Sequence, residues 1–391
     1  MSVGVAILGS TGSIGQSTLQ VLARQRERFH VAALTARSNA ELLARQVAEW
    51  GPSYVGLVNG DKGERTGAGT SRDGQGRGTG RGRGRGPDCL VEAATRPDVQ
   101  IVVNGIVGAA GLAATLAALR AGKRVALANK ETLVMAGELV TRAAREGGGE
   151  VVPVDSEHSA ALQCITGRQP TEVARLILTA SGGPFRTSTP ARVADATVEE
   201  ALRHPTWKMG KKITVDSATL VNKALEVIEA HFLFGLPYEA VDVVVHPQSV
   251  VHAFVEFVDG AVLAQVGFPT MELPILYALT HPVRVPDAGT RRFDPVAAGP
   301  LSFEPVQPDL YPAYGLGRAA AATGGTAPTV FNAANEVAVE LFLAGRIRLG
   351  RIAETIARVL EHHRPTSAAS LEAVLGADAE ARGLAREAAC S

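Results

Sequence analysis

Near its beginning, the chain reads Val3-Gly4-Val5-Ala6-Ile7-Leu8-Gly9-Ser10-Thr11-Gly12-Ser13-Ile14-Gly15. The apolar run that ends at Leu8 predicts a buried parallel β-strand, and a helical pattern follows from Ser17 to Arg24. Glycines at such a strand-to-helix turn let the backbone approach a pyrophosphate, to which the helix N-terminus offers N–H donors. The stretch therefore predicts a Rossmann-like domain that binds a dinucleotide, with a tight turn that binds nothing as the alternative.

The next strand, predicted from His30 to Thr35, indicates which dinucleotide is bound. Proteins that bind NAD usually place an Asp or Glu near the end of this strand, where it binds the ribose 2′-hydroxyl. Here the strand is followed by Arg37, Ser38 and Asn39, with no acid. Because Arg37 can meet a 2′-phosphate, we expect NADP(H) rather than NAD(H); an exposed surface arginine is the alternative.

Further strands, predicted over 54–58, 99–104 and 124–128, alternate with helices and extend the α/β pattern to about residue 150. Lys130 and Glu131 follow the last of these strands. Ligands of doubly wound sheets bind beyond the carboxyl ends of the strands, so we expect these two residues near a ligand. An ordinary ion pair in a loop is the alternative.

A segment of mostly Gly and Arg, from about residue 60 to 86, interrupts this pattern. We expect a disordered insertion, because such a composition cannot form a core. Arg-Gly repeats can also bind single-stranded nucleic acid. The zero net charge of the chain and the lack of aromatic residues in the segment argue against a nucleic-acid partner.

The composition is that of a globular protein without a membrane span. Hydrophobic residues make up 46% of the chain, but no apolar run reaches the roughly 18 residues that a membrane span needs. Cys89, Cys164 and Cys390 are scattered, and no leader pattern precedes the first strand. We therefore expect a cytoplasmic location and no membrane partner.

A second informative stretch, Val151-Val152-Pro153-Val154-Asp155-Ser156-Glu157-His158, ends in two carboxylates one residue apart. In an extended chain such residues point to the same side, so Asp155 and Glu157 can converge on one point. Hard oxygen ligands suit Mg²⁺ or Mn²⁺ better than zinc. Glu226, on a predicted helix, can complete a three-carboxylate site. A polar strand end with solvated acids is the alternative.

Two further features favour a phosphorylated substrate. Ser181-Gly182-Gly183 follows a predicted strand and can form a nest of backbone N–H groups for a phosphate, with a structural turn as the alternative. Asp216 or Ser217 is a good N-cap for the next predicted helix. The N-terminus of that helix and Lys223 together form a second phosphate-friendly feature.

Sequence patterns divide the chain into three domains and a linker. Residues 1–150 are expected to form the Rossmann-like NADP-binding domain, and residues 151–285 a central α/β catalytic domain. The proline-rich stretch 286–312 is typical of a linker, and residues 313–391 have the helical periodicity of a small bundle. The predicted fold class is therefore α/β, with a C-terminal helical bundle.

Together these blocks resemble the 1-deoxy-D-xylulose 5-phosphate reductoisomerase family. The resemblance is carried, in chain order, by Gly9–Gly15, Ile106–Gly111, Ala128–Glu131, Pro153–His158, Ser181–Phe185, His204–Trp207, Val215–Thr219, Asn222–Glu226, His246–Ser249 and Asn332–Glu336. An ordered set that runs nearly end to end is highly specific, and only the Gly/Arg segment departs from it.

The resemblance implies conversion of 1-deoxy-D-xylulose 5-phosphate to 2-C-methyl-D-erythritol 4-phosphate, with NADPH and Mg²⁺ or Mn²⁺, in the non-mevalonate route to isoprenoid precursors. It also implies a homodimer. The implied cofactor contacts are Thr11, Gly12, Ser13, Ile14, Arg37, Ser38, Asn39, Asn129, Glu131 and Gly210. The implied metal ligands are Asp155, Glu157 and Glu226, which with Lys130 and His204 form the implied catalytic set. The implied substrate contacts are Lys130, Ser156, Glu157, Ser181, His204, Ser217, Asn222, Lys223 and Glu226.

One other enzyme class fits the first half of the chain. Another NADP-dependent oxidoreductase, acting on a small aldehyde or semialdehyde, would also have a Rossmann-like domain followed by a catalytic domain. It would need no carboxylate triad, so dependence on a metal separates the two interpretations.

Overall fold

The structure, a computed structural model, describes residues 2–59, 82–207 and 209–390. The chain folds into two compact units. The first unit consists of Met1–Asn129, Arg142–Val154 and Met271–Thr290, and the second of Lys130–Thr141, Asp155–Thr270 and Arg291–Ser391.

A parallel seven-stranded sheet forms the centre of the first unit, in the order β4-β3-β2-β1-β5-β6-β7. Its strands are β1 (Val3–Leu8), β2 (Phe29–Ala36), β3 (Tyr54–Leu57), β4 (Gly82–Arg85), β5 (Ile101–Asn104), β6 (Arg124–Leu127) and β7 (Glu150–Pro153). Its helices are α1 (Ser13–Arg24), α2 (Ala40–Trp50), α3 (Asp88–Thr95), α4 (Leu112–Arg120) and α11 (Glu272–Thr280), with a 3-10 turn at Ala109–Gly111. The strand order reverses between β1 and β5, so the glycine-rich turn after β1 lies at the switch point of the sheet. This arrangement confirms the predicted Rossmann-like fold.

Strand β4 corrects one expectation from the sequence. Residues 60–81 of the Gly/Arg segment lie outside the described residues, but Gly82–Arg85 pair with β3 at the edge of the sheet. Glycine suits position 84, because a Cβ atom there would lie 1.9 Å from the Tyr54 hydroxyl oxygen and neighbouring atoms would have to shift. The expectation of disorder as far as residue 86 is therefore wrong at this end, because strand pairing uses backbone groups and needs no apolar side chains.

The second unit contains a mixed five-stranded sheet, in the order β11-β10-β8-β9-β12. Its strands are β8 (Val173–Ala180), β9 (Val241–Val245), β10 (Val251–Phe257), β11 (Val262–Val266) and β12 (Glu304–Pro305). β8 runs parallel to β9 and antiparallel to β10. Helices α6 (Ser156–Ile165) and α10 (Val221–Phe234) pack against the sheet around buried residues such as Leu176, Leu178 and Val227.

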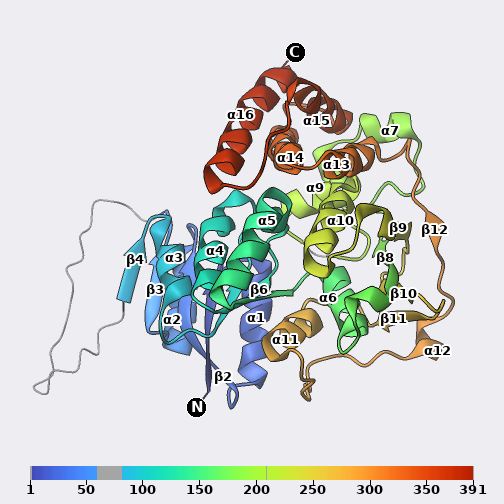
Figure 1. The fold of residues 1–391 in the computed structure, drawn as a ribbon. Coiled ribbons are helices and arrows are strands. Elements are labelled where there is room, and N and C mark those ends of the chain that lie inside the picture. Colours follow the sequence, from blue (N-terminus) through green and yellow to red (C-terminus); the bar gives the residue numbers. More distant parts are fainter. Residues whose placement is uncertain (1, 60–81, 208, 391) are drawn as a thin grey trace, which may run out of the picture. The chain divides into compact units, whose positions relative to one another are not determined.

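Helices make up most of the rest of the second unit. They are α7 (Pro190–Ala194), α8 (Val198–Ala201), α9 (Lys211–Ala218), α12 (Pro295–Ala298), α13 (Pro312–Thr323), α14 (Ala327–Leu343), α15 (Gly350–His362) and α16 (Leu371–Cys390), with 3-10 turns at Pro170–Glu172 and Tyr238–Ala240. Helix α5 (Lys130–Gly147) begins in this unit and ends in the first. Helices α14, α15 and α16 pack together (Figure 1), and their core continues into α10 through Val221 and Ile228. Among the helices that the structure describes, none combines the length and the apolarity that a membrane span requires.

Candidate active site

Asp155 and Glu157 lie at the start of α6, in the second unit. Asp155 is the N-cap of this helix, and its Oδ1 accepts a hydrogen bond from the Ser156 backbone N–H at 3.1 Å. Glu157 lies in the first helical turn. The expectation that both carboxylates share one side of an extended chain is therefore wrong. They approach each other through a cap and a first turn, where negative charge also complements the helix dipole.

Helix α10 brings a third carboxylate, that of Glu226, to the same place. Carboxylate oxygens of Asp155, Glu157 and Glu226 lie within 4.8 Å of one another. Asn222, one turn earlier on α10, donates to Glu226 Oε1 at 3.4 Å, as their i, i+4 spacing predicts. The structure thus brings together the three carboxylates that the sequence singles out.

Two lysines, Lys130 and Lys223, neutralise part of this negative charge. Lys130 Nζ contacts Asp155 Oδ2 and lies 3.1 Å from Glu226 Oε1. Lys223 Nζ contacts Glu157 Oε1 and lies 2.6 Å from Glu226 Oε2. Burial by itself lowers the pKa of Lys223, but Glu157 and Glu226 raise it above its ordinary value. Burial by itself raises the pKa of Glu157, but Lys223 and Lys130 lower it to about 2, so this carboxylate is ionised at neutral pH.

The chain between α9 and α10 differs from the sequence expectation. Asp216 and Ser217, expected at a helix N-cap, lie inside α9. Helix α10 begins only at Val221, after Leu220 adopts a left-handed φ of 53°. Sequence patterns do not reveal this break, because leucine rarely adopts that conformation.

Ser181, His204 and Ser217 form a second polar group in this unit. His204 Nε2 lies 3.0 Å from Ser181 Oγ and 3.1 Å from Ser217 Oγ. The Gly183 backbone N–H donates to Ser181 Oγ at 3.1 Å. Gly183 has a φ of +63°, and a Cβ atom there would lie 2.8 Å from the Ser217 carbonyl oxygen. Three residues expected at the substrate therefore meet where the loop after β8 packs against α9.

His204 is held as a neutral imidazole. Its Nδ1 accepts hydrogen bonds from the backbone N–H groups of Thr206 and Trp207, at 3.1 and 2.9 Å. Nδ1 therefore carries no proton, and the ring N–H is at Nε2, facing the two serines. Burial, and then the charge of Lys223, lower the pKa of His204 to about 4. His204 thus offers a hydrogen-bond donor without a positive charge.

In the first unit, the residues expected at the cofactor pyrophosphate surround the start of α1. This helix begins at Ser13, with Gly12 as its N-cap, and Thr11 and Ile14 flank these two residues. Within the described residues, no side chain caps the helix, so an anion can take that role. The turn itself is held by Ser10, whose hydroxyl donates to Gln46 Oε1 at 2.7 Å.

Other expected cofactor residues also lie at strand ends of the first unit. Arg37, Ser38 and Asn39 directly follow β2 and are exposed. Asn39 Oδ1 accepts from the Leu42 backbone N–H at 3.1 Å and so caps α2. Asn129 is buried after β6 and donates to two backbone carbonyls of the turn after β5, at 2.8 and 3.0 Å. These residues are placed as the α/β pattern predicts.

Glu131 and Gly210, the other two expected cofactor residues, lie in the second unit. Gly210 is the exposed N-cap of α9. Glu131 is buried, and its Oε1 lies 2.9 Å from Lys212 Nζ. Lys212 Nζ also lies 2.8 Å from Asp216 Oδ2, and Asn335 of α14 donates to Asp216 Oδ1 at 2.8 Å. Burial by itself lowers the pKa of Lys212, but Asp216 and Glu131 raise it above its ordinary value.

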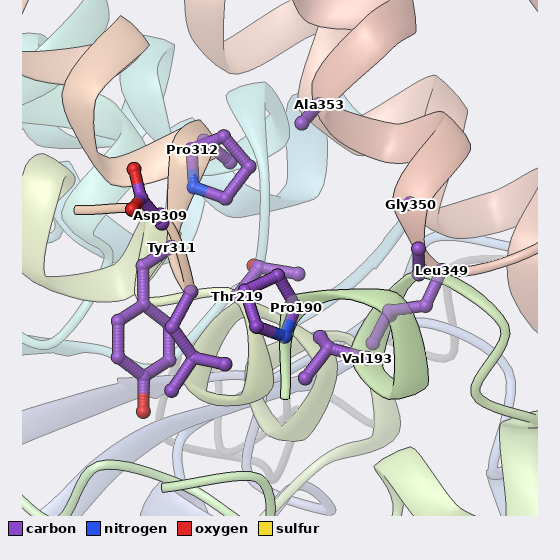
Figure 2. Close-up of a pocket in the computed structure, with 12 residues that line it drawn as sticks. Pro190, Val193, Thr219, Asp309, Tyr311, Pro312, Leu349, Gly350 and Ala353 are labelled. Carbon is purple, nitrogen blue, oxygen red and sulfur yellow. The ribbon is translucent and has the colours of Figure 1, made fainter. Parts of the chain in front are cut away.

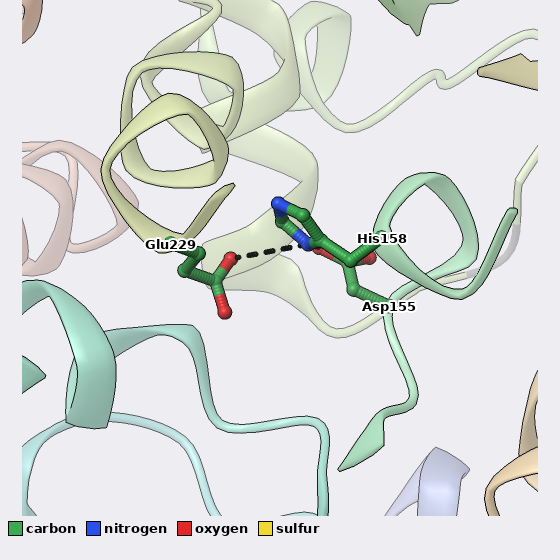
Figure 3. A group of neighbouring side chains, drawn as sticks. All are labelled: Asp155, His158 and Glu229. Atoms are coloured by element: carbon green, nitrogen blue, oxygen red, sulfur yellow. Dashed lines mark ion pairs between the residues drawn. The ribbon is translucent and has the colours of Figure 1, made fainter. Parts of the chain in front are cut away.

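A fourth carboxylate near the site, that of Glu229, is not singled out by sequence reasoning. Figure 3 shows His158 of α6 between Asp155 and Glu229 of α10. His158 Nδ1 lies 3.6 Å from Asp155 Oδ2 and 3.7 Å from Glu229 Oε2. The signal that could have found Glu229 is its position three residues after Glu226, one turn along the same helix.

A small apolar pocket lies elsewhere in the second unit, where α7, α13 and α15 meet (Figure 2). Its walls include Val193, Leu310, Leu349 and Tyr311. The Tyr311 hydroxyl donates to the Gly182 carbonyl oxygen at 2.8 Å. None of the residues that the sequence predicts for the site lines this pocket.

The first unit has a parallel sheet with a glycine-rich first turn, and the second unit has a group of carboxylates and lysines. These features define a class of α/β proteins in which a Rossmann-like unit is followed by a unit with a polar site. Comparison with known proteins narrows this class. A family model of 1-deoxy-D-xylulose 5-phosphate reductoisomerase matches residues 5–137, and models of its C-terminal domains match residues 151–234 and 266–384.

Individual relatives match over nearly the whole chain. The 1-deoxy-D-xylulose 5-phosphate reductoisomerase of Geobacillus kaustophilus (strain HTA426) is 48% identical, with 98% of each chain covered. That of Symbiobacterium thermophilum is also 48% identical, with 99% of each covered. The solved structure of the Zymomonas mobilis reductoisomerase in complex with NADPH matches with a TM-score of 0.89 at 41% identity over 100% of both chains. A DOX-P reductoisomerase in complex with NADPH, fosmidomycin and magnesium matches with a TM-score of 0.88 at 40% identity, over 99% of this chain and 98% of that one. The chain belongs to the 1-deoxy-D-xylulose 5-phosphate reductoisomerase family, which confirms the resemblance.

Proposed function

We propose that this chain converts 1-deoxy-D-xylulose 5-phosphate to 2-C-methyl-D-erythritol 4-phosphate, by a rearrangement and an NADPH-dependent reduction that require Mg²⁺ or Mn²⁺. The observation that carries the proposal is the convergence of Asp155, Glu157 and Glu226, with Lys130 in contact with them, in a chain of this family. Two similar solved structures hold NADPH, and one of these also holds magnesium and fosmidomycin.

Asp155, Glu157 and Glu226 fit a hard divalent cation, because each offers an anionic oxygen and the three converge. When bound, the metal would supply Lewis-acid polarisation of the substrate ketone and the neighbouring hydroxyl oxygen. Lys130, which already faces two of the carboxylates, would stabilise the negative charge that develops on a substrate oxygen.

The second polar group would hold the substrate phosphate. Ser181, His204 and Ser217 are already in contact, and Asn222 and Lys223 follow on the next helix. A neutral His204 can donate one hydrogen bond to a phosphate oxygen while Lys223 supplies positive charge. Binding the remote phosphate orients the reacting carbons. Ser156, Glu157 and Glu226 would contact the sugar part of the substrate.

The first unit would hold most of the cofactor. NADPH would supply the hydride. The backbone at Thr11, Gly12, Ser13 and Ile14 would bind its pyrophosphate, because the start of α1 offers N–H groups and a positive dipole. Arg37, Ser38 and Asn39 would bind the adenosine end, and Asn129, Glu131 and Gly210 would line the rest of the cofactor.

We further propose a cytoplasmic homodimer without a nucleic-acid or membrane partner. Support for the dimer comes from β11, an edge strand with exposed apolar side chains at Val262 and Leu263. Residues 1–150 would bind NADPH and residues 151–285 the metal and substrate, with 286–312 as a linker to the helical part at 313–391.

The test is oxidation of NADPH by the purified chain in the presence of 1-deoxy-D-xylulose 5-phosphate, followed at the absorbance of the reduced nicotinamide. We expect oxidation that stops with a chelator, returns with Mg²⁺ or Mn²⁺, and yields 2-C-methyl-D-erythritol 4-phosphate by mass spectrometry. NADPH oxidation with small aldehydes or semialdehydes, but not with this substrate, would show the alternative enzyme class instead.

A further inference from the structure

His158 makes a contact with α10 that fixes which of its nitrogens carries hydrogen. Its Nε2 lies 2.8 Å from the Glu226 backbone oxygen. A carbonyl oxygen only accepts hydrogen bonds, so Nε2 must donate. A neutral imidazole has a single N–H, which leaves Nδ1 as a bare acceptor. That nitrogen faces Asp155 Oδ2 and Glu229 Oε2, which are themselves acceptors when ionised.

His158 and Glu229 are buried, and each has a polar atom without a hydrogen-bond partner. His158 is 0% exposed and Glu229 is 3% exposed. Among the described residues, neither His158 Nδ1 nor Glu229 Oε2 has a hydrogen-bond partner. Acceptors that face one another in a dry interior are unfavourable unless a proton lies between them.

We propose that Glu229 is a positioning residue that acts through His158 to hold Asp155 and Glu226 in their metal-binding arrangement. His158 contacts the Asp155 carboxylate through one nitrogen and the Glu226 backbone through the other, so its ring spans α6 and α10. Glu229 Oε2 faces the same ring nitrogen as Asp155, Nδ1, at 3.7 Å, and so would restrict the position of the ring. Groups behind metal ligands commonly set the orientation of those ligands.

A second metal ion bound by Asp155, His158 and Glu229 is the competing explanation. The three side chains do offer ligand atoms within 4.8 Å of one another. However, Asp155 Oδ2 already contacts Lys130 and belongs to the three-carboxylate site. His158 and Glu229 are also buried, which disfavours the entry of a hydrated ion between them. The arrangement therefore favours a support for one metal site.

The first experiment compares Glu229→Gln with Glu229→Met in the full chain, using Mn²⁺ binding measured by electron paramagnetic resonance of the free ion. Glutamine can donate an amide hydrogen towards Nδ1, so its Mn²⁺ affinity should stay near the parent value. Methionine has similar length but no donor, so the Mn²⁺ dissociation constant should rise roughly 10- to 100-fold. An unchanged constant in a folded Glu229→Met chain would overturn the proposal, as would equal losses in both variants.

A double-mutant cycle shows whether Glu229 acts through the ring. His158→Gln keeps an amide N–H for the Glu226 carbonyl but removes Nδ1, so it should weaken Mn²⁺ binding as Glu229→Met does. Adding Glu229→Met to His158→Gln should then change nothing more, whereas additive losses would contradict the proposal. If Glu229→Met does not fold, the other two single variants test the proposal. His158→Gln must then weaken Mn²⁺ binding and Glu229→Gln must leave it unchanged, and any other result would contradict the proposal.

A control variant and the number of Mn²⁺ ions bound per chain complete the test. Thr355→Val also removes a buried polar group of the second unit, whose hydroxyl donates to the Arg351 carbonyl, and it should leave Mn²⁺ binding unchanged. Two Mn²⁺ ions per chain, one of them lost in Glu229→Gln, would overturn the proposal in favour of a second metal. Because this role rests on the proposed function, the parent chain is assayed with 1-deoxy-D-xylulose 5-phosphate as well. If the parent chain shows no metal-dependent turnover, the proposed function is wrong. If the parent chain is active but Glu229→Met binds Mn²⁺ as the parent does, only the role proposed for Glu229 is wrong.

Discussion

Glu226 is the carboxylate that both lysines of the site share. Its two oxygens lie 3.1 Å from Lys130 Nζ and 2.6 Å from Lys223 Nζ. Glu226→Gln keeps the shape of the side chain but removes its charge, so the metal loses one of three anionic ligands. Loss of a residue that only supports a metal ligand weakens metal binding by roughly 10-fold or more. We expect the loss of a ligand itself to raise the metal concentration for half-maximal turnover by at least that factor. The measurement is the rate of NADPH oxidation against Mg²⁺ concentration.

The matched control is Glu256→Gln, which removes a carboxylate that pairs with Arg175 at the surface of the same unit. Exposed ion pairs contribute little to stability, so its metal dependence should equal that of the parent chain. Normal turnover of Glu226→Gln at limiting Mg²⁺ would remove Glu226 from the set of metal ligands.

His204 should titrate far from the usual range of histidine. Burial and the charge of Lys223 lower its pKa to about 4, so it stays neutral from pH 5 upwards. An unfolded histidine takes up its proton near its ordinary pKa of roughly 6.5. The free energy of unfolding should therefore fall as the pH drops through the window between these two values, because the unfolded chain then binds the additional proton.

Histidine ring signals in an NMR titration measure this directly. The signal that disappears in His204→Asn should shift near pH 4, in the chain without substrate. A midpoint near 6.5 would contradict the two backbone N–H donors assigned to Nδ1.

At the scale of elements, α14 supports α9 from behind the site. Asn335 of α14 donates to Asp216 of α9, which in turn binds Lys212. Asn335→Leu leaves a buried carboxylate oxygen without its donor, and we expect the free energy of unfolding to fall by about 1–3 kcal/mol. Asn335→Asp should cost more, because it places a second carboxylate against Asp216. Urea denaturation measures both changes, and parent-like stability of Asn335→Asp would show that this contact does not support α9.

Strand β4 depends on glycine at one position. A Cβ atom at Gly84 would meet the Tyr54 hydroxyl and Cys89 Cβ, at 1.9 and 2.7 Å. Gly84→Ala should therefore lower the free energy of unfolding by about 1–3 kcal/mol through overpacking. Gly376 on α16 has open space around it, so Gly376→Ala should not destabilise the chain. Equal unfolding midpoints for the two variants in urea would show that β4 does not pack as described.

The sequence predicts a helix or strand correctly where the pattern of apolar and polar side chains determines the backbone conformation. Strand β1 has the predicted bounds, because an unbroken apolar run has few alternatives to a buried strand. Strand β4 was missed because its pairing depends on backbone groups and on the space beside Tyr54. The break at Leu220 was missed because it depends on tertiary packing that overrides the preference of leucine.

The site shows the same division. Asp155, Glu157 and Glu226 could be named from the sequence, but the extended geometry assigned to the first two was wrong, since a helix begins at Ser156. Glu229 was not named, although it follows Glu226 by one helical turn, because a buried glutamate on an apolar helix becomes informative only when His158 is seen beside it.

At the scale of the whole molecule, β11 decides the proposed assembly. It is an edge strand, and Val262 and Leu263 on it are 50% and 41% exposed. Leu263→Asp should convert a dimer to a monomer in analytical ultracentrifugation, because a buried, unpaired carboxylate strongly disfavours an interface. Val296→Asp, at an apolar side chain of α12 that is 88% exposed, is the matched control and should remain dimeric. A monomeric parent chain, or a Leu263→Asp variant that stays dimeric, would contradict this interface.

Strand β4 also affects how this gene can change. In Gly82–Arg85, glycine and arginine alternate with the two-residue period of a β-strand, so glycines take the face crowded by Tyr54 and arginines are exposed. The same dipeptide recurs just before this strand in the sequence. Gain or loss of one Gly-Arg unit by replication slippage therefore presents an equivalent strand to β3, with every side chain on its proper face. The repeat can therefore vary in length in two-residue steps without loss of the sheet edge, whereas insertion of one residue within Gly82–Arg85 would exchange the two faces.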